Sequence, residues 1–422
     1  MRDLNSAEFP VLRELFNITR EVVAGVLATT SLFSVCLLIA AQPSSYARHE
    51  FQPPIQEPSN NLYSFSDAAL AEARRFLLNG EFALCLREIK RLAKSGVAPK
   101  LIYAAEAEVF RRTAYLDREL DSLHSWAKAD PKNEEPQLRL FYKYFDLGWT
   151  AEASERSGLA RKISPSAMGS LTAAAILQYR SDEPSKALPF VDLAIRQSPS
   201  NDRLLNLKAS ILIKSHMSAV AVPFLRQTLK RNPSYQLNQE ALAMALLQIG
   251  KEVEAKSIFR QLQLQNPAHI ESAYHLGLLA QKQGDVNEAI HQFEKASRLN
   301  IKHNNVSFLL GQLYLTHGKV EEGRKLLALY KKLDGNTAAY NQTMAQLRSR
   351  PKDAGLHYKM AQFHLGSDEL PQAIVELRRV LQLQPIHPSA RQELAKALND
   401  NGRATEAREL IQGAANRLRT KR

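Results

Sequence analysis

The chain has 422 residues, of which 45% are hydrophobic and 23% are charged, and its formal net charge is +13. This balance excludes a wholly disordered or fibrous chain, because it supplies enough apolar material for a core. Two cysteines, Cys36 and Cys85, are too few for a disulfide framework or a cysteine-based metal site. Residues 1–50 contain four arginines and five acidic residues, so the remainder carries +14, and composition leaves an anionic partner open.

The N-terminal region contains an uncharged run, 22–41, that is long enough to cross a bilayer. Its second half, 32–41, has the length of the apolar part of a signal peptide. Ser45-Tyr46-Ala47 then offers a cleavage site with small residues at both ends. We therefore predict that residues 1–47 are either a cleaved signal peptide or a retained membrane anchor.

Arginines flank this run unevenly. Three of them precede it, Arg2, Arg13 and Arg20, whereas Arg48 is the single basic residue that closely follows it. Because the side richer in Lys and Arg stays in the cytoplasm, we expect the rest of the chain to be exported. The expected location is the periplasm or the outer face of the inner membrane of a bacterium.

Prolines organise the remainder of the chain. In 48–65 they are closely spaced, which disfavours a helix and predicts an extended linker. Beyond it, five prolines recur at one constant interval: Pro131, Pro165, Pro199, Pro233 and Pro267. A fixed period of this length indicates an array of helical repeats. Frames counted from these prolines place eight copies in 66–337.

The clearest copy, 270–303, predicts two short antiparallel helices. Leu276, Leu279 and Ala280 lie on one helical face, and Gly284 follows at a turn. Two positions are small in nine of ten copies. Position 8 reads Ala73, Ala107, Phe141, Ala175, Ala209, Ala243, Gly277, Gly311, Ala361 and Ala395. Position 20 reads Cys85, Glu119, Ala153, Ala187, Ala221, Ala255, Ala289, Gly323, Ala373 and Ala407. We infer that the two helices of each copy cross closely at these positions.

This pattern resembles the tetratricopeptide repeat family. The copy at 270–303 matches the family at Leu276-Gly277, Ala289, Phe293 and Ala296, and departs from it at Ala273, Ala280 and Ile301. The resemblance implies an all-α, right-handed superhelical solenoid of tandem helix-turn-helix repeats. It also implies a concave groove lined by the first helix of each copy.

One segment, 338–353, lies outside the repeat frame. Ala338 to Arg350 can form a helix that ends before Pro351, so we predict an inserted helix or a hinge. Residues 354–422 hold two further copies and a basic tail, and the last helix, which carries Glu406, is expected to face water.

No motif in the sequence points to catalysis. It contains no glycine-rich phosphate loop, no nucleophile elbow and no HExxH, and its histidines are scattered. We therefore predict a protein that is not an enzyme, with no cofactor and no metal. The resemblance instead assigns groove-binding positions to Arg111, Arg112, Tyr142, Tyr179, Arg180, Lys214, Met244, Gln281 and Lys282.

These observations predict a scaffold or adaptor of the bacterial cell envelope. It would bind an extended peptide or a helix of a partner protein in its concave groove, and no nucleic acid is expected. Two alternatives stay open: a binder of an anionic polymer (acidic polysaccharide or nucleic acid) through its basic surface, and the regulatory subunit of a separate enzyme.

Overall fold

The computed structural model describes residues 65, 67–181, 183–299 and 304–419, which form helices and no β-strand. The chain divides into two units, 1–50 and 51–422, and every described residue belongs to the second. The expected signal or anchor and nearly all of the expected linker therefore lie outside the described residues. Among the described residues, no helix combines the length and the apolarity that a membrane span requires.

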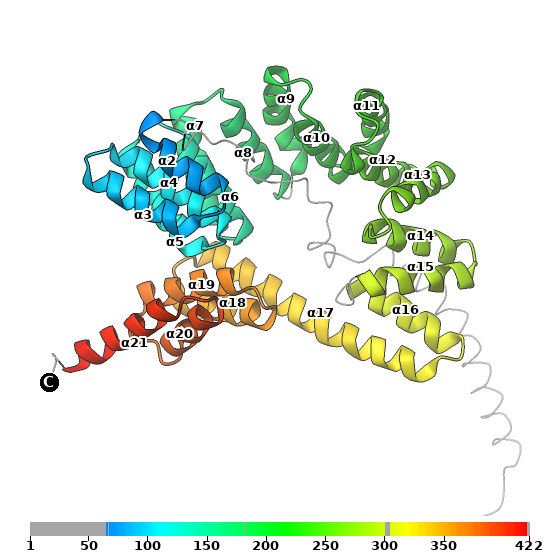
Figure 1. The fold of residues 1–422 in the computed structure, drawn as a ribbon. Helices are drawn as coiled ribbons and strands as arrows, with labels where there is room; N and C mark the ends of the chain where they lie inside the picture. Colours follow the sequence, from blue (N-terminus) through cyan, green and yellow to red (C-terminus); the bar gives the residue numbers. More distant parts are fainter. Residues whose placement is uncertain (1–64, 66, 182, 300–303, 420–422) are drawn as a thin grey trace, which may run out of the picture. The chain divides into compact units, whose positions relative to one another are not determined.

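The helices pair in chain order (Figure 1). The first helices of the pairs are α2 (Ala71–Leu78), α4 (Pro99–Arg112), α6 (Glu135–Asp146), α8 (Met168–Tyr179), α10 (Asp202–Lys214), α12 (Gln236–Gln248), α14 (Ile270–Lys282), α16 (Asn304–Thr316), α18 (Ala354–Gly366) and α20 (Ala390–Asp400). The second helices are α3 (Phe82–Lys94), α5 (Leu116–Ala129), α7 (Thr150–Ile163), α9 (Leu188–Gln197), α11 (Ser218–Arg231), α13 (Glu252–Gln265), α15 (Val286–Leu299), α17 (Val320–Ser349), α19 (Leu370–Leu383) and α21 (Ala404–Arg419). Two short 3-10 helices, η3 (Ala68–Leu70) and η4 (Pro184–Ala187), precede α2 and α9. The predicted all-α repeat solenoid is confirmed.

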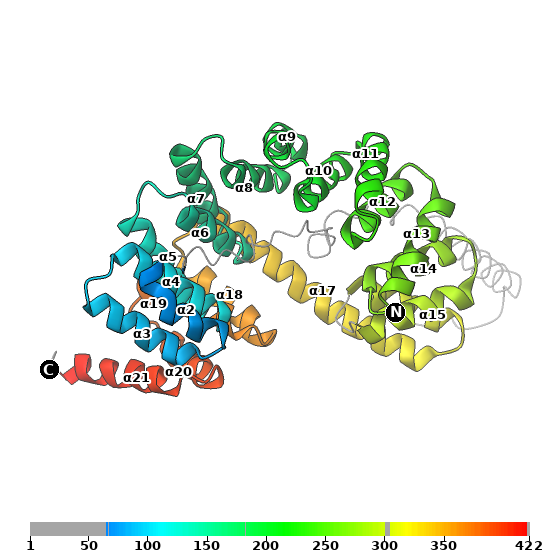
Figure 2. The same cartoon turned by 45° about the horizontal axis from the view of Figure 1, so that its top comes forward.

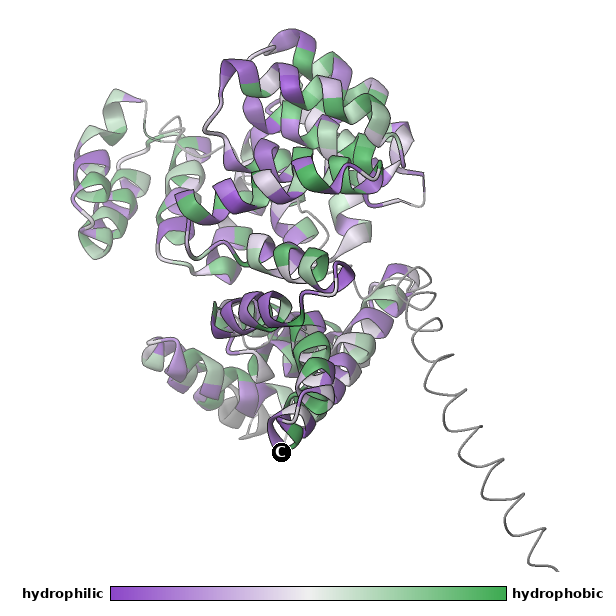
Figure 3. Cartoon of the chain, turned by 90° about the vertical axis from the view of Figure 1, so that its right-hand side faces the viewer, coloured by the Kyte–Doolittle hydropathy of each residue, from purple (hydrophilic) through white to green (hydrophobic). Residues whose placement is uncertain are grey.

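The two small-residue columns meet where the helices of a pair cross. The Cys85 thiol donates a hydrogen bond to the carbonyl oxygen of Ala73 over 3.1 Å. A Cβ added to Gly323 would lie 2.8 Å from the carbonyl oxygen of Gly311. Every residue of both columns is buried. Figure 3 shows hydrophobic and hydrophilic residues on opposite sides of many helices, as such packing requires.

The regularly spaced prolines occupy the same structural position in successive repeats. Pro131 and Pro267 each lie two residues after a second helix ends, at Ala129 and Gln265. The turn inside most described repeats contains one residue in the left-handed region. The majority of these residues are glycines, such as Gly250 with a φ of 78°. The others are Ala114, His216 and Asp368.

Two larger residues, Phe141 and Glu119, occupy positions that are small in the other copies, and the surrounding structure accommodates them in different ways. Phe141 is fully buried and packs against Phe145, with 5.7 Å between ring centroids. Glu119 is 2% exposed, and its carboxylate lies 3.3 Å from Arg139 Nη2 and 3.2 Å from Lys143 Nζ. The buried charge is therefore balanced by the first helix of the next repeat.

Helix α17 is a single rod of 30 residues (Figures 1 and 2). It combines the second helix of the eighth copy with residues 338–349, which the frame places outside the repeats. Pro351 lies two residues after its end, as the periodic prolines do after other second helices. The inserted segment is thus mostly helical and continuous with the preceding repeat.

Adding one methyl group at a helix crossing should destabilise the array. In Gly277→Ala the new Cβ would lie 2.7 Å from Phe293 Cε1, and Phe293 is fully buried. We expect the free energy of unfolding in urea to fall by roughly 1–3 kcal/mol. The matched control is Gly158→Ala in α7, where the new Cβ meets nothing within 4 Å and helix propensity should add up to about 1 kcal/mol. Equal effects of the two changes would contradict the crossing geometry.

Candidate functional site

The nine predicted groove residues all lie in the C-terminal half of first helices or directly after them. They come from α4, α6, α8, α10, α12 and α14. We call the outward-facing side of α4 to α14 that carries these residues the first-helix face. Their surroundings differ enough that they cannot all contact a partner in the same way.

The two tyrosines of this set are buried. Tyr142 is 6% exposed and Tyr179 is 4% exposed. The Lys214 ammonium lies 4.8 Å from the centroid of the Tyr179 ring, and Arg180 lies at the same distance from the Phe145 ring. The rings therefore belong to the core and support cations, and the cations are the groups that reach the surface.

The two arginines of α4 share one carboxylate. Arg111 donates to Glu108 over 2.9 and 2.6 Å, and Arg112 donates to it over 2.9 Å. Burial opposes the ionisation of Glu108, but the hydrogen bonds from both arginines outweigh it and lower the pKa of Glu108. The charge of these two predicted groove residues is thus partly neutralised within their own helix.

The part of the face on α12 and α14 is more apolar. Four half-buried aliphatic side chains lie at positions that the resemblance assigns to the groove: Leu237, Met244, Leu247 and Leu278. Gln281 is half-buried beside them in the sequence, and the exposed Lys282 pairs with Glu252 of α13. A partner could bury aliphatic surface on this part and meet amide and ammonium groups beside it.

Two carboxylates of the same face are close enough to interact. Burial raises the pKa of Glu271 to about 7, and the negative charge of Glu240 adds to the rise while His269 opposes it. His269 Nε2 lies 3.5 Å from Glu240 Oε2. The motif search missed this pair because its members belong to different repeats. Both lie in the first two turns of adjacent first helices, α12 and α14, and this placement was the available signal.

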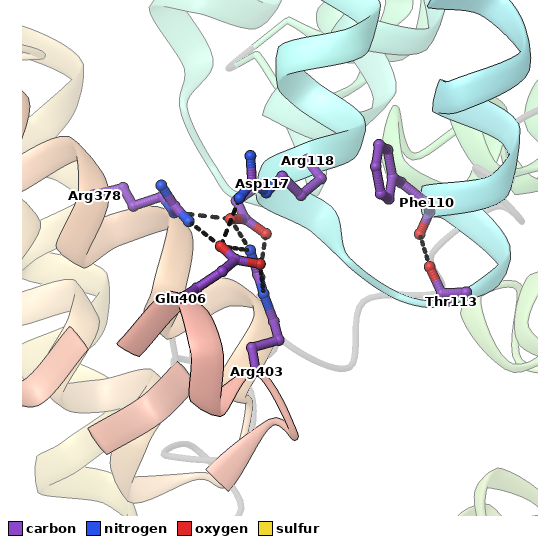
Figure 4. A network of polar contacts seen from close by, with 7 residues as sticks. All are labelled: Phe110, Thr113, Asp117, Arg118, Arg378, Arg403 and Glu406. Carbon is purple, nitrogen blue, oxygen red and sulfur yellow. Dashed lines mark hydrogen bonds and ion pairs between the residues drawn. The ribbon is translucent and has the colours of Figure 1, made fainter. Parts of the chain in front are cut away.

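A second candidate site joins repeats that are far apart in sequence (Figure 4). Both oxygens of Asp117 in α5 accept hydrogen bonds from Arg403, over 2.6 and 2.8 Å, and Arg378 Nε lies 2.8 Å from the same carboxylate. Glu406 accepts from Arg403, from Arg378 over 3.1 Å and from Arg118 over 2.7 Å. We call these five residues the clasp. Glu406 was expected in water and instead lies half-buried in this network.

An aromatic contact lies beside the clasp. The indole N–H of Trp149 donates to Glu376 Oε1 over 2.6 Å, and His357 Nδ1 lies 2.6 Å from Glu376 Oε2. Arg379 donates to Glu152 of α7 over 3.3 Å. We call these residues the Trp149 contact. Its partners are up to 227 residues apart, so no local pattern in the sequence could have indicated it.

Comparison with known proteins agrees with this architecture. A family profile described as tetratricopeptide repeat matches residues 280–347 and 364–420. In these two segments the chain consists of tetratricopeptide repeats, as the spacing of its small residues predicts. Repeats of this family generally act as non-catalytic scaffolds for protein–protein interaction. Among the described residues, no group of three or more His, Cys, Asp or Glu side chains is placed to hold a metal ion.

Several solved structures are similar in fold. A tetratricopeptide repeat protein from Parabacteroides merdae is 17% identical, with 60% of this chain and 99% of that chain covered and a TM-score of 0.49. PilW, a type IV pilus biogenesis factor, is 19% identical, with 48% and 94% covered and a TM-score of 0.45. YrrB, described as having an unusual peptide-binding site, is 19% identical, with 48% and 100% covered and a TM-score of 0.35. No curated protein matches the chain.

The raised pKa of Glu271 predicts a pH-dependent stability of the first-helix face. Because the folded chain holds this proton up to about pH 7 and the unfolded chain releases it near 4.5, stability should fall as the pH rises between these values. Glu271→Gln should remove this fall and raise the free energy of unfolding at pH 7.5 by on the order of 2 kcal/mol. Urea unfolding between pH 4.5 and 8 measures both. An unchanged pH profile in the variant would contradict the burial of this carboxyl.

The His357–Glu376 pair predicts its own pH dependence. Burial disfavours the charged imidazole, but the hydrogen bond and charge of Glu376 outweigh burial and raise the pKa of His357 above 6.5. Its contribution to stability is therefore complete below pH 6.5 and is lost as the pH rises through the raised pKa. His357→Gln should cost roughly 1–2 kcal/mol at pH 6 and less at pH 8.5.

His124→Gln is the control for this prediction. Burial lowers the pKa of His124 to about 4, so this side chain is neutral throughout the pH range 6 to 8.5. The loss in free energy of unfolding caused by His124→Gln, measured in urea, should therefore be the same at every pH in that range. A flat cost for His357→Gln as well would show that its imidazole is not charged in the folded chain.

Proposed function

We propose that this protein is a non-catalytic scaffold of the bacterial cell envelope that binds an extended or helical segment of a partner protein on its first-helix face. The observation that carries the proposal is the aliphatic strip on α12 and α14, where half-buried side chains lie at recurring positions of adjacent repeats. Covering apolar surface of this kind with a partner removes it from water, which favours binding.

The predicted groove residues take different roles in this proposal. Met244 and Gln281 would contact the partner directly, and Arg180, Lys214 and Lys282 would border it as cations. Tyr179 would hold Lys214 in place from the core, and the buried Tyr142 would support the face from within without touching the partner. Arg111 and Arg112, already paired with Glu108, would contribute least.

A preformed solenoid suits this task for an energetic reason. The repeat surface is fixed by buried helix crossings, so binding orders the partner segment and costs little conformational entropy on the scaffold side. Several weak contacts along successive repeats then add up on one rigid support. The envelope location rests on residues 1–47, whose apolar run and flanking arginines indicate export.

The test is crosslinked affinity capture from the native host with the full chain as bait. Met244→Asp combined with Leu278→Asp places two charges on the aliphatic strip, and should lower capture of the partner at least about tenfold. The matched control is Val253→Asp combined with Leu264→Asp on α13, where the side chains are 83% and 84% exposed. The control should capture as the unmodified chain does, and both variants should keep the circular dichroism spectrum of the unmodified chain.

The ionic strength of the wash separates the proposal from its rival. Binding through an aliphatic strip should survive about 1 M salt, whereas an anionic polymer held by surface cations should be released. Capture of polymer alone, or an equal loss in face and control variants, would contradict the proposed site.

A further inference from the structure

The middle of α17 is a long stretch of helix without buried side chains. Between Gly323 and Thr343 no residue of this helix is buried. Gly335 lies near the centre of the stretch, and a Cβ added there would meet nothing within 4 Å. Glycine is the weakest helix former after proline, and Asn336 follows it. The helix is therefore easiest to bend at this point.

Different hydrophobic cores lie on the two sides of this point. On the N-terminal side, Leu326 packs against the core of α14 to α16. On the C-terminal side, Tyr340, Met344 and Leu347 pack with Leu356 and Met360 of α18. The described core clusters do not cross the stretch between them. Residues 338–419 thus form one packed piece, which we call the C-terminal module.

The C-terminal module is held against α5 and α7 largely by complementary charges. Three pairs set an acid of α5 or α7 against an arginine of the module: Asp117–Arg378, Asp117–Arg403 and Glu152–Arg379. The pair Arg118–Glu406 has the opposite polarity. Apolar and aromatic contacts accompany these charges. Val375 joins the core of the early repeats, and Met344 Cε occupies the place where a Cβ of Gly148 would lie. The ring of buried Trp149 lies 5.3 Å from the ring of His357.

An interface of this composition specifies one geometry without adding much net stability. Bringing the clasp charges out of water costs nearly as much free energy as their attraction returns. The paired charges nevertheless favour a single docked arrangement, since misaligned pairs would leave buried charges alone. Polar interfaces within a chain usually permit relative motion of the parts they join.

We propose that the clasp is a latch and Gly335–Asn336 a hinge. In the closed state α17 is straight, and the C-terminal module covers Asp117 of α5 and Glu152 of α7. In the open state α17 bends at Gly335, the clasp and the Trp149 contact separate, and that side is exposed. The scaffold therefore has two shapes, which differ in the accessibility of its second-helix surface in the early repeats.

Energy transfer between two dyes on single full-length molecules tests this device. The dyes are attached at Lys128→Cys in α5 and Lys396→Cys in α20, both exposed positions, in a chain carrying Cys36→Ser. Burial raises the pKa of the Cys85 thiol to about 11, so this remaining cysteine should not react at neutral pH. The unmodified chain should show mainly high transfer, with a minor low-transfer population.

Four variants separate the latch from the hinge. Arg378→Gln with Arg403→Gln should increase the low-transfer population at least tenfold. Arg379→Gln, at a partly exposed ion pair, is the milder change and should act in the same direction. Gly335→Ala added to the double variant should shift the equilibrium roughly fivefold back toward closed. Gly158→Ala, a helical glycine in equally open space, is the matched control and should leave the populations unchanged.

Two results would overturn the proposal. The first is an unchanged transfer distribution in both latch variants. The second is an effect of Gly335→Ala no larger than that of Gly158→Ala. Hydrogen exchange of the α4 and α18 amides distinguishes opening from unfolding, because opening leaves both sets protected.

Discussion

The close approach of the two helices in each repeat is the constraint on which the rest of the structure depends. Ala73 and Cys85 touch through a thiol–carbonyl hydrogen bond, and Gly311 and Gly323 meet backbone to backbone. Where side chains are this small, the helices pack at short range and their relative position has little freedom. The constant repeat length follows, because each repeat must return to the same crossing.

Where a larger or charged residue replaces a small one at a helix crossing, the chain makes contacts beyond those between the two helices of a repeat. Glu119 occupies a small-residue position and is accommodated by Arg139 and Lys143 of the next repeat. Two residues earlier, Asp117 is buried against Arg403 of the last repeat. Repeats at the start of an array ordinarily expose one side to water. In this chain the second helices α5 and α7 also meet the C-terminal module, which supplies the buried Asp117 with its arginine partners.

Most of the fold could be predicted from the sequence, because its determinants recur within a single repeat. The crossing at Gly277 and the turn at Gly284 depend only on local spacing. The site was less accessible to such reasoning. The burial of Tyr142 and Tyr179 depends on neighbouring repeats, and the Asp117–Arg403 pair joins residues 286 apart with no shared period. The continuity of α17 could not be predicted for another reason. The repeat frame marks the end of the eighth copy at residue 337, and it does not show that the helix continues beyond that residue.

Acidic and basic groups are distributed unevenly over the first-helix face. Several of the arginines that make the array basic are engaged with acids, as Arg111 is with Glu108 and Arg403 with Asp117. On α12 and α14 the face instead presents Glu240 and Glu271. A cationic side chain placed beside Glu271 would favour its ionised form and release a proton on binding. The net charge of +13 therefore does not describe this part of the face.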